Sequence, residues 1–131
     1  MKSVHQNLLE LIPKDKGDYK TARNLKNYTI AELKSIVPKL LEWTQDLHWP
    51  ISGIVAEYLV DNFSEIEDEI YPILITNDDI WKWNVINIFK NLIRNEKIIT
   101  VIKRIAENPT EMEKCEELDL LCKEIVEIRK W

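Results

Sequence analysis

Tryptophan and aspartate recur together in the middle of the chain, and they are the residues best suited to recognition chemistry. Four tryptophans lie between residues 43 and 83, and two of them close a D-x-x-W motif, Asp46 to Trp49 and Asp78 to Trp81. Aromatic rings beside carboxylates suit a ligand that has an apolar body and basic groups. Packing of the same rings within the core is the alternative interpretation.

Other polar residues of these turns allow two further kinds of chemistry. His48 lies between Asp46 and Trp49, so it could act as a general base oriented by a carboxylate, although a turn residue packed beside tryptophan is the favoured interpretation. Asp78 and Asp79 could bind a hard cation, but we expect one of them to cap the following helix. The sequence has no HExxH, G-x-S-x-G, P-loop or CxxC motif. We therefore expect no catalytic residue, no metal site and no cofactor.

Two lysines near the N-terminus complete the candidate binding site. Lys14 and Lys16 lie in a loop, and we expect them to form salt bridges with the aspartate-bearing turns. If these turns share one edge of the fold, Trp49 and Trp81 lie side by side. The candidate binding residues are Lys14, Asp15, Lys16, Gln45, Asp46, Trp49, Asp78, Asp79 and Trp81.

The elements that position these residues are helices. Apolar residues recur with helical period along the chain, and no segment alternates with period two. Short connections predict antiparallel packing, so we expect an all-α fold of about eight antiparallel helices. Capping boxes are predicted at residues 29–32, 64–67 and 110–113, and breaks at Pro38 and Pro72. The expected helices cover 3–12, 18–27, 30–47, 50–62, 65–76, 79–94, 96–107 and 110–129.

The two cysteines, Cys115 and Cys122, lie in the last predicted helix. Their spacing of seven residues is too long for a disulfide within a helix, and no further cysteine or histidine nearby completes a metal site. We place both of them, with Met112, on one buried apolar stripe. Free thiols and the lack of an export signal indicate the cytoplasm.

The composition excludes several classes of protein. The chain has 131 residues, of which 45% are hydrophobic and 31% charged, so it is not a disordered chain and it fits a single domain over residues 1–131. No stretch is apolar for long enough to span a membrane. The net charge of −5 argues against a nucleic-acid-binding protein.

This net charge is unevenly distributed. Residues 42–81 contain ten acidic side chains and no lysine or arginine, and both neighbouring segments are basic. An acidic surface of this kind would attract a protein partner with a basic surface. A solvated helical face is the alternative.

Each D-x-x-W motif follows a helix with an internal proline and precedes an amphipathic helix. This order resembles the HEAT repeat and, more broadly, the armadillo-type helical repeats. The resemblance implies a short HEAT-like α-α superhelical stack, and a closed helical bundle is the alternative. HEAT repeats usually carry an arginine soon after the turn, whereas this chain has Ser52 and Asn84 there.

A second resemblance depends on four motifs that follow one another in residues 13–18, 41–46, 48–50 and 77–82. They resemble the signatures P-K-D-K-x-D, L-L-x-W-x-Q-D-x-N-W-P and N-D-D-x-W-K of a small bacterial family known only as a domain of unknown function. His48 replaces the asparagine that is usual there. The family implies a helical, HEAT-like fold but no activity. Its members sometimes accompany proteins found with contact-dependent toxins, which suggests an immunity- or adaptor-type role.

These observations predict a cytoplasmic, non-enzymatic protein-interaction module. The alternative is a small-ligand-binding protein or an enzyme that uses a cleft lined by the tryptophan and aspartate side chains. We expect neither a nucleic-acid partner nor a membrane.

Overall fold

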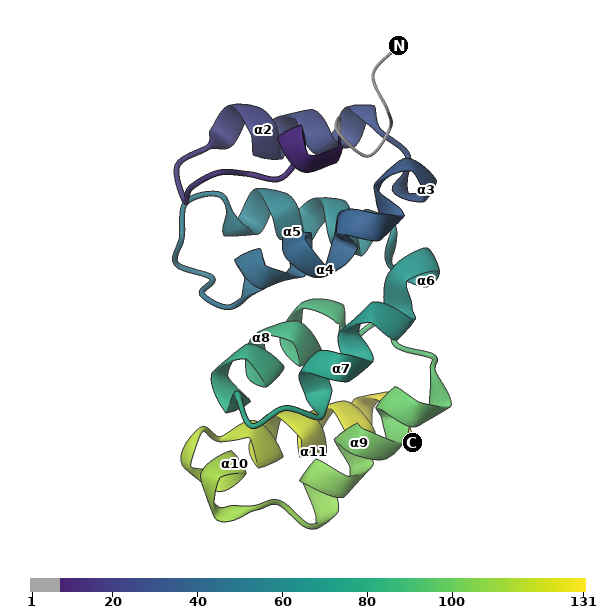
Figure 1. Cartoon of the computed structure of the whole chain (residues 1–131). Helices are drawn as coiled ribbons and strands as arrows, with labels where there is room; N and C mark the ends of the chain where they lie inside the picture. Colours follow the sequence, from purple (N-terminus) through teal and green to yellow (C-terminus); the bar gives the residue numbers. More distant parts are fainter. Residues whose placement is uncertain (1–7) are drawn as a thin grey trace. The chain divides into compact units, whose positions relative to one another are not determined.

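The computed structural model describes residues 8–131, and this part of the chain is helical with no β-strand. The predicted all-α class is confirmed, and the number of helices is close to the eight predicted. The chain divides into two compact units, one that ends at Ile66 and one that spans Glu67–Trp131 (Figure 1). The HEAT-like stack and the single domain stay predictions, and the start of the predicted helix 3–12 lies outside the described residues.

The described part of the first unit is built around α5 (Ser52–Asp61), which is the longest helix there. Helices α2 (Tyr19–Asn24) and α4 (Val37–Leu41) pack against α5, on which Val55 and Leu59 are completely buried. The remaining segments are short: η1 (Leu25–Asn27), α3 (Ile30–Leu33), η2 (Lys34–Ile36), η3 (Glu42–Thr44) and α6 (Phe63–Ile66). Helices this short are marginal in water by themselves, so tertiary packing must hold them.

Proline accounts for the breaks in two of the predicted helices. Pro38 lies in the first turn of α4, and Pro72 lies in the first turn of α7 (Tyr71–Leu74). A first-turn proline loses no helical hydrogen bond, because its N–H would have no partner within the helix. In each case a 3₁₀ helix precedes the proline-bearing helix, η2 before α4 and η4 (Glu67–Ile70) before α7. The two predicted breaks are thus confirmed.

The second unit has a core of three longer helices, α8 (Asp79–Phe89), α9 (Glu96–Glu107) and α11 (Leu118–Arg129). Helix α11 packs against both α8 and α9, and α7 also contacts α8 and α9 (Figure 1). Phe89 and Ile102 are completely buried between these helices. The apolar residues of α8, α9 and α11 therefore share one core.

Two of the three predicted capping boxes are present. Thr29 with Glu32 begins α3, and Thr110 with Glu113 begins α10 (Glu111–Cys115). The third is wrong, because Ser64 lies inside α6 and does not begin a helix. The carboxylate of Glu67 instead accepts hydrogen bonds from the backbone N–H groups of residues 94 and 95, at 2.7 and 2.6 Å, and so holds the turn before α9.

The predicted helix 110–129 is also wrong as a single element. Glu117 adopts a left-handed conformation with φ of 56°, which ends α10 before α11 starts. The predicted buried stripe does not extend into α10. Met112 and Cys115 are exposed, whereas Cys122 is buried, and both cysteines are free thiols.

Candidate functional site

The N-terminal motif forms a loop that its own aspartates hold in place. Asp15 accepts a hydrogen bond from the Gly17 N–H at 2.9 Å. Asp18 caps α2 by accepting from the Thr21 N–H at 3.2 Å, and its other oxygen accepts from the Lys14 N–H at 3.0 Å. The bond from Lys14 is the main reason that the pKa of Asp18 is lowered. The side chains of Lys14 and Lys16 are exposed, and the expected salt bridges to the aspartate-bearing turns stay a prediction.

The first D-x-x-W motif makes a tight turn. Asp46 accepts a hydrogen bond from the His48 N–H at 2.9 Å, and the Ser52 hydroxyl donates to the carbonyls of Trp43 and Asp46 at 2.6 and 2.8 Å. The His48 imidazole is fully exposed, with Nδ1 3.3 Å from the Asp46 carboxylate. His48 is therefore a turn residue on the surface.

Two tryptophans of the first unit contact each other beside this turn. The rings of Trp43 and Trp49 lie 5.5 Å apart between centroids and cross at 75°, an edge-to-face pair. Both are half-buried, and with Gln45 they line a small pocket of about 200 Å³. The structure therefore brings Gln45 and Trp49 together, and adds Trp43, which the candidate set lacks.

The second D-x-x-W motif lies in the second unit. Asp78 caps α8 by accepting a hydrogen bond from the Trp81 N–H at 3.0 Å, so the predicted N-cap is confirmed. Trp81 is half-buried. The pairing of Trp49 with Trp81 stays a prediction, since the two tryptophans belong to different units.

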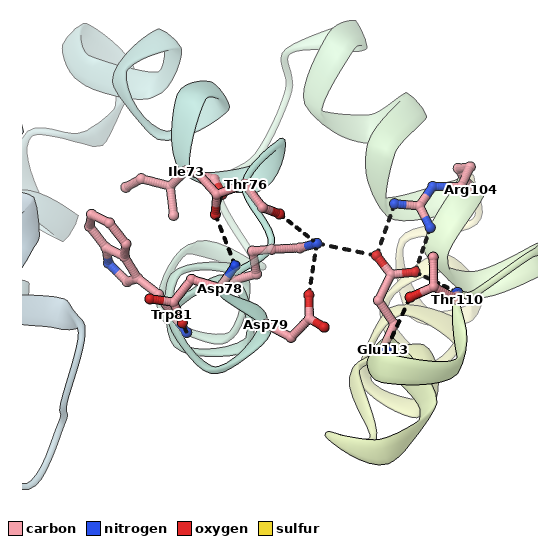
Figure 2. A network of polar contacts seen from close by, with 9 residues as sticks. Ile73, Thr76, Asp78, Asp79, Trp81, Arg104, Thr110 and Glu113 are labelled. Atoms are coloured by element: carbon pink, nitrogen blue, oxygen red, sulfur yellow. Dashed lines mark hydrogen bonds and ion pairs between the residues drawn. The ribbon is translucent and has the colours of Figure 1, made fainter.

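Asp79, next to the cap, has a different environment. It is buried and forms an ion pair with Lys82 at 2.9 Å, one turn along α8. Lys82 is itself only 4% exposed. Its ammonium group also donates to Glu113 Oε2 and to the Thr76 carbonyl, both at 3.2 Å (Figure 2). All three N–H donors of the buried amine thus have an oxygen acceptor.

Glu113 is the centre of this buried network (Figure 2). The two terminal nitrogens of Arg104 donate to its two carboxylate oxygens at 2.5 and 2.9 Å, and the Thr110 N–H donates at 2.8 Å. Burial by itself would raise the pKa of Glu113. The hydrogen bonds from Arg104, Thr110 and Lys82 outweigh burial and lower this pKa from 4.5 to about 2. The Glu113 carboxylate therefore stays charged at neutral pH.

A cleft of about 760 Å³ opens beside the network, lined by the loop after α7 and by α9 and α10. Its volume is in the range of small-molecule sites in proteins. Arg104 contributes a side chain that is 42% exposed. Ile75 and Met112, 62% and 65% exposed, add two large apolar side chains.

Of the candidate residues, Asp79 is the one that lines this cleft together with the network; Lys82, Arg104 and Glu113 were not predicted. The sequence does contain a signal for Lys82. A lysine within an otherwise apolar helix and an aspartate one turn before it indicate a buried ion pair. Arg104 has no comparable signal, because its partner lies on another helix.

The described helices and this charged cleft define an all-α protein with a preformed surface site. Within residues 8–131, no helix is long and apolar enough to cross a membrane, and no three His, Cys, Asp or Glu side chains are placed to hold a metal ion. The sequence matches the family described as Domain of unknown function (DUF5071) over residues 11–126, so the chain belongs to this family. Comparison with curated proteins gave no match.

Proposed function

We propose that the protein is a non-enzymatic protein-interaction module that binds its partner in the cleft of the second unit. The observation that carries this proposal is the combination of a buried, internally paired charged floor with an exposed apolar rim. Asp79, Lys82 and Glu113 form the floor, and Ile75 and Met112 form the rim. Large exposed apolar side chains beside a cleft are typical of surfaces that bind another molecule.

The charges of the floor favour binding over catalysis. A general acid or base needs a pKa near the working pH, whereas the pKa of Glu113 is about 2. The Lys82 ammonium makes three polar contacts, which leave it no free N–H for a substrate. In the first unit, His48 is fully exposed beside Asp46 and lacks the enclosed site that usually positions a catalytic histidine.

The broader role that we propose is an immunity- or adaptor-type protein of the bacterial cytoplasm with a HEAT-like fold. Glu57, Asp61 and Glu65 are exposed in the first unit, which supports a partner with a basic surface. Glu67 and Asp68 contribute less to such a surface, because they already accept hydrogen bonds from the backbone and side chain of the turn before α9.

Site-specific photo-crosslinking in the native host tests the proposal. A benzophenone amino acid replaces Ile75 or Met112 in the cleft, and Leu120 or Ile128 on α11 as matched controls. The controls are also large, apolar and exposed, but they do not line the cleft. We expect a protein adduct of one defined mass from both cleft positions and from neither control. Adducts of equal yield at all four positions, or none, would contradict the proposal.

A small-ligand-binding protein is the second candidate, and the volume of the cleft favours it. Native mass spectrometry of protein purified from its host tests this function. The second proposal replaces the first if a small molecule stays bound to the wild type and is lost from Met112→Lys, and if crosslinking finds no protein adduct.

A further inference from the structure

The guanidinium of Arg104 has one edge that Glu113 does not use. A guanidinium carries five N–H donors in a flat fork. Glu113 accepts one hydrogen bond from each of the two terminal nitrogens. These two N–H groups form the end of the fork. Within residues 8–131, Arg104 donates to no other side chain or carbonyl. The side edge, formed by Nε–H and the remaining N–H of the neighbouring nitrogen, is thus available for a second acceptor.

Glu113 also fixes the direction of that edge. Its side chain is 3% exposed and is itself held by the Thr110 N–H and by Lys82. Two parallel N–H···O bonds to such a carboxylate leave the guanidinium little rotational freedom. The entropy cost of ordering a long side chain is thereby met before any ligand binds.

Arg104 is the charge that a ligand in the cleft meets first. Four charged residues line the cleft, and three of them, Asp79, Lys82 and Glu113, are buried. Arg104 is the most exposed of the four. The four formal charges cancel, but the accessible one is positive, so an anionic group is the complementary ligand.

The apolar rim narrows the class of ligand further. Ile75 and Met112 line the same cleft as Arg104 and expose most of their side chains. A free inorganic anion would leave these side chains in water, whereas a peptide with an apolar residue next to an acidic one would cover them.

We propose that the cleft binds an aspartate or glutamate side chain that is flanked by an apolar residue in a partner protein. The carboxylate accepts two hydrogen bonds from the side edge of Arg104, and the apolar residue packs on Ile75 and Met112. This inference rests on the proposed function, and it adds the chemistry of the segment that the module recognises.

The test is an NMR titration of the full-length protein, labelled with ¹⁵N, with two tripeptides. N-acetyl-Leu-Asp-Leu-amide is the probe, and N-acetyl-Leu-Asn-Leu-amide carries a neutral amide of the same size in place of the carboxylate. We expect the first to shift the Nε–H signal of Arg104 and the amide signals of residues 75–77, and the second to bind at least about tenfold more weakly. Equal binding of the two peptides would overturn the proposal. Inorganic phosphate that binds as tightly as the aspartate peptide would overturn it as well.

Two variants locate the binding. Arg104→Lys keeps the positive charge but cannot present a planar edge with two N–H donors, so we expect it to bind the aspartate peptide more weakly than the wild type and to discriminate less between the two peptides. Met112→Ser removes half of the apolar rim, and Leu120→Ser is its control outside the cleft. If Met112→Ser binds the aspartate peptide more weakly than Leu120→Ser does, the result supports the site even where Arg104→Lys fails to fold. Equal binding of the peptide by the two serine variants refutes the site.

The failure of this inference and the failure of the proposed function give different results. A protein adduct at Ile75 without binding of either tripeptide refutes the acidic segment and leaves the interaction module standing. Selective binding of the aspartate peptide without a protein adduct in the host refutes the module and leaves the carboxylate site standing.

Discussion

Glu113→Gln is the substitution that tests the buried network most directly. The change keeps the size of the side chain and removes its charge, so Arg104 and Lys82 lose their shared carboxylate. The pKa of Glu113 is about 2 in the folded protein, against 4.5 for an unperturbed glutamate. At about 1.4 kcal/mol for each unit of pKa, the charged carboxylate stabilises the fold by about 3 kcal/mol at pH 7.

The sign of the pH dependence follows from the lowered pKa. The folded state holds the proton less tightly than the unfolded state, so the stabilisation is complete above pH 4.5 and is lost as the pH falls toward 2. The same relation gives about 1.4 kcal/mol at pH 3 and about 0.4 kcal/mol at pH 2. The wild type should therefore approach the stability of Glu113→Gln in acid.

Urea denaturation at pH 7 and pH 3, followed by the NMR signals of α9 and α11, measures both numbers. Glu111→Gln is the matched control, because Glu111 lies in the same helix, is 91% exposed and pairs with Lys114 at the surface. We expect the control to change the free energy of unfolding by less than about 0.5 kcal/mol. A Glu113→Gln protein as stable as the wild type at pH 7, or a difference that does not shrink in acid, would refute the assignment of Glu113 as the centre of the network.

Three further substitutions and modifications test other parts of the structure. Trp49→Ala should lower the free energy of unfolding of the first unit by about 2 kcal/mol, because it removes a half-buried ring from the pair with Trp43. An unchanged melting temperature would favour a binding role for Trp49. Burial raises the pKa of the Cys122 thiol to about 12, so iodoacetamide at pH 8 should alkylate Cys115 alone, and mass spectrometry should find two labels only after unfolding in urea. Asp78→Ala removes the cap of α8 and should cost about 1 kcal/mol in urea denaturation, whereas Asp78→Asn should keep most of the stability.

Much of the fold can be predicted from the sequence where the signal is local. Thr29, Thr110 and Asp78 each accept a hydrogen bond from an N–H three residues ahead, so the sequence spacing itself encodes the start of the helix. Pro38 and Pro72 mark breaks for the same reason, because a proline acts on its own turn.

Other features depend on contacts that no local spacing encodes. Ser64 and Glu67 have the spacing of a capping box, yet the carboxylate of Glu67 binds the backbone of the turn before α9. Glu117 adopts its left-handed conformation without being a glycine or an asparagine, so nothing in its type predicts the break between α10 and α11. Met112, which lies in α10 before that break, is exposed and forms part of the apolar rim of the cleft.

The motif N-D-D-I-W-K, at residues 77–82, contains polar side chains that bind other groups of the second unit. Asp78 caps α8, whereas Asp79 and Lys82 pair inside the second unit. Each of these polar side chains is thus satisfied within the protein, and substitution of any one of them would act first on stability. Recognition instead requires groups that still have donors or apolar surface to offer. Among the residues that line the cleft, such groups are Arg104 and the two rim residues, and all three lie outside the motif. Residues that show what this protein binds should therefore be sought around the cleft and outside the motif.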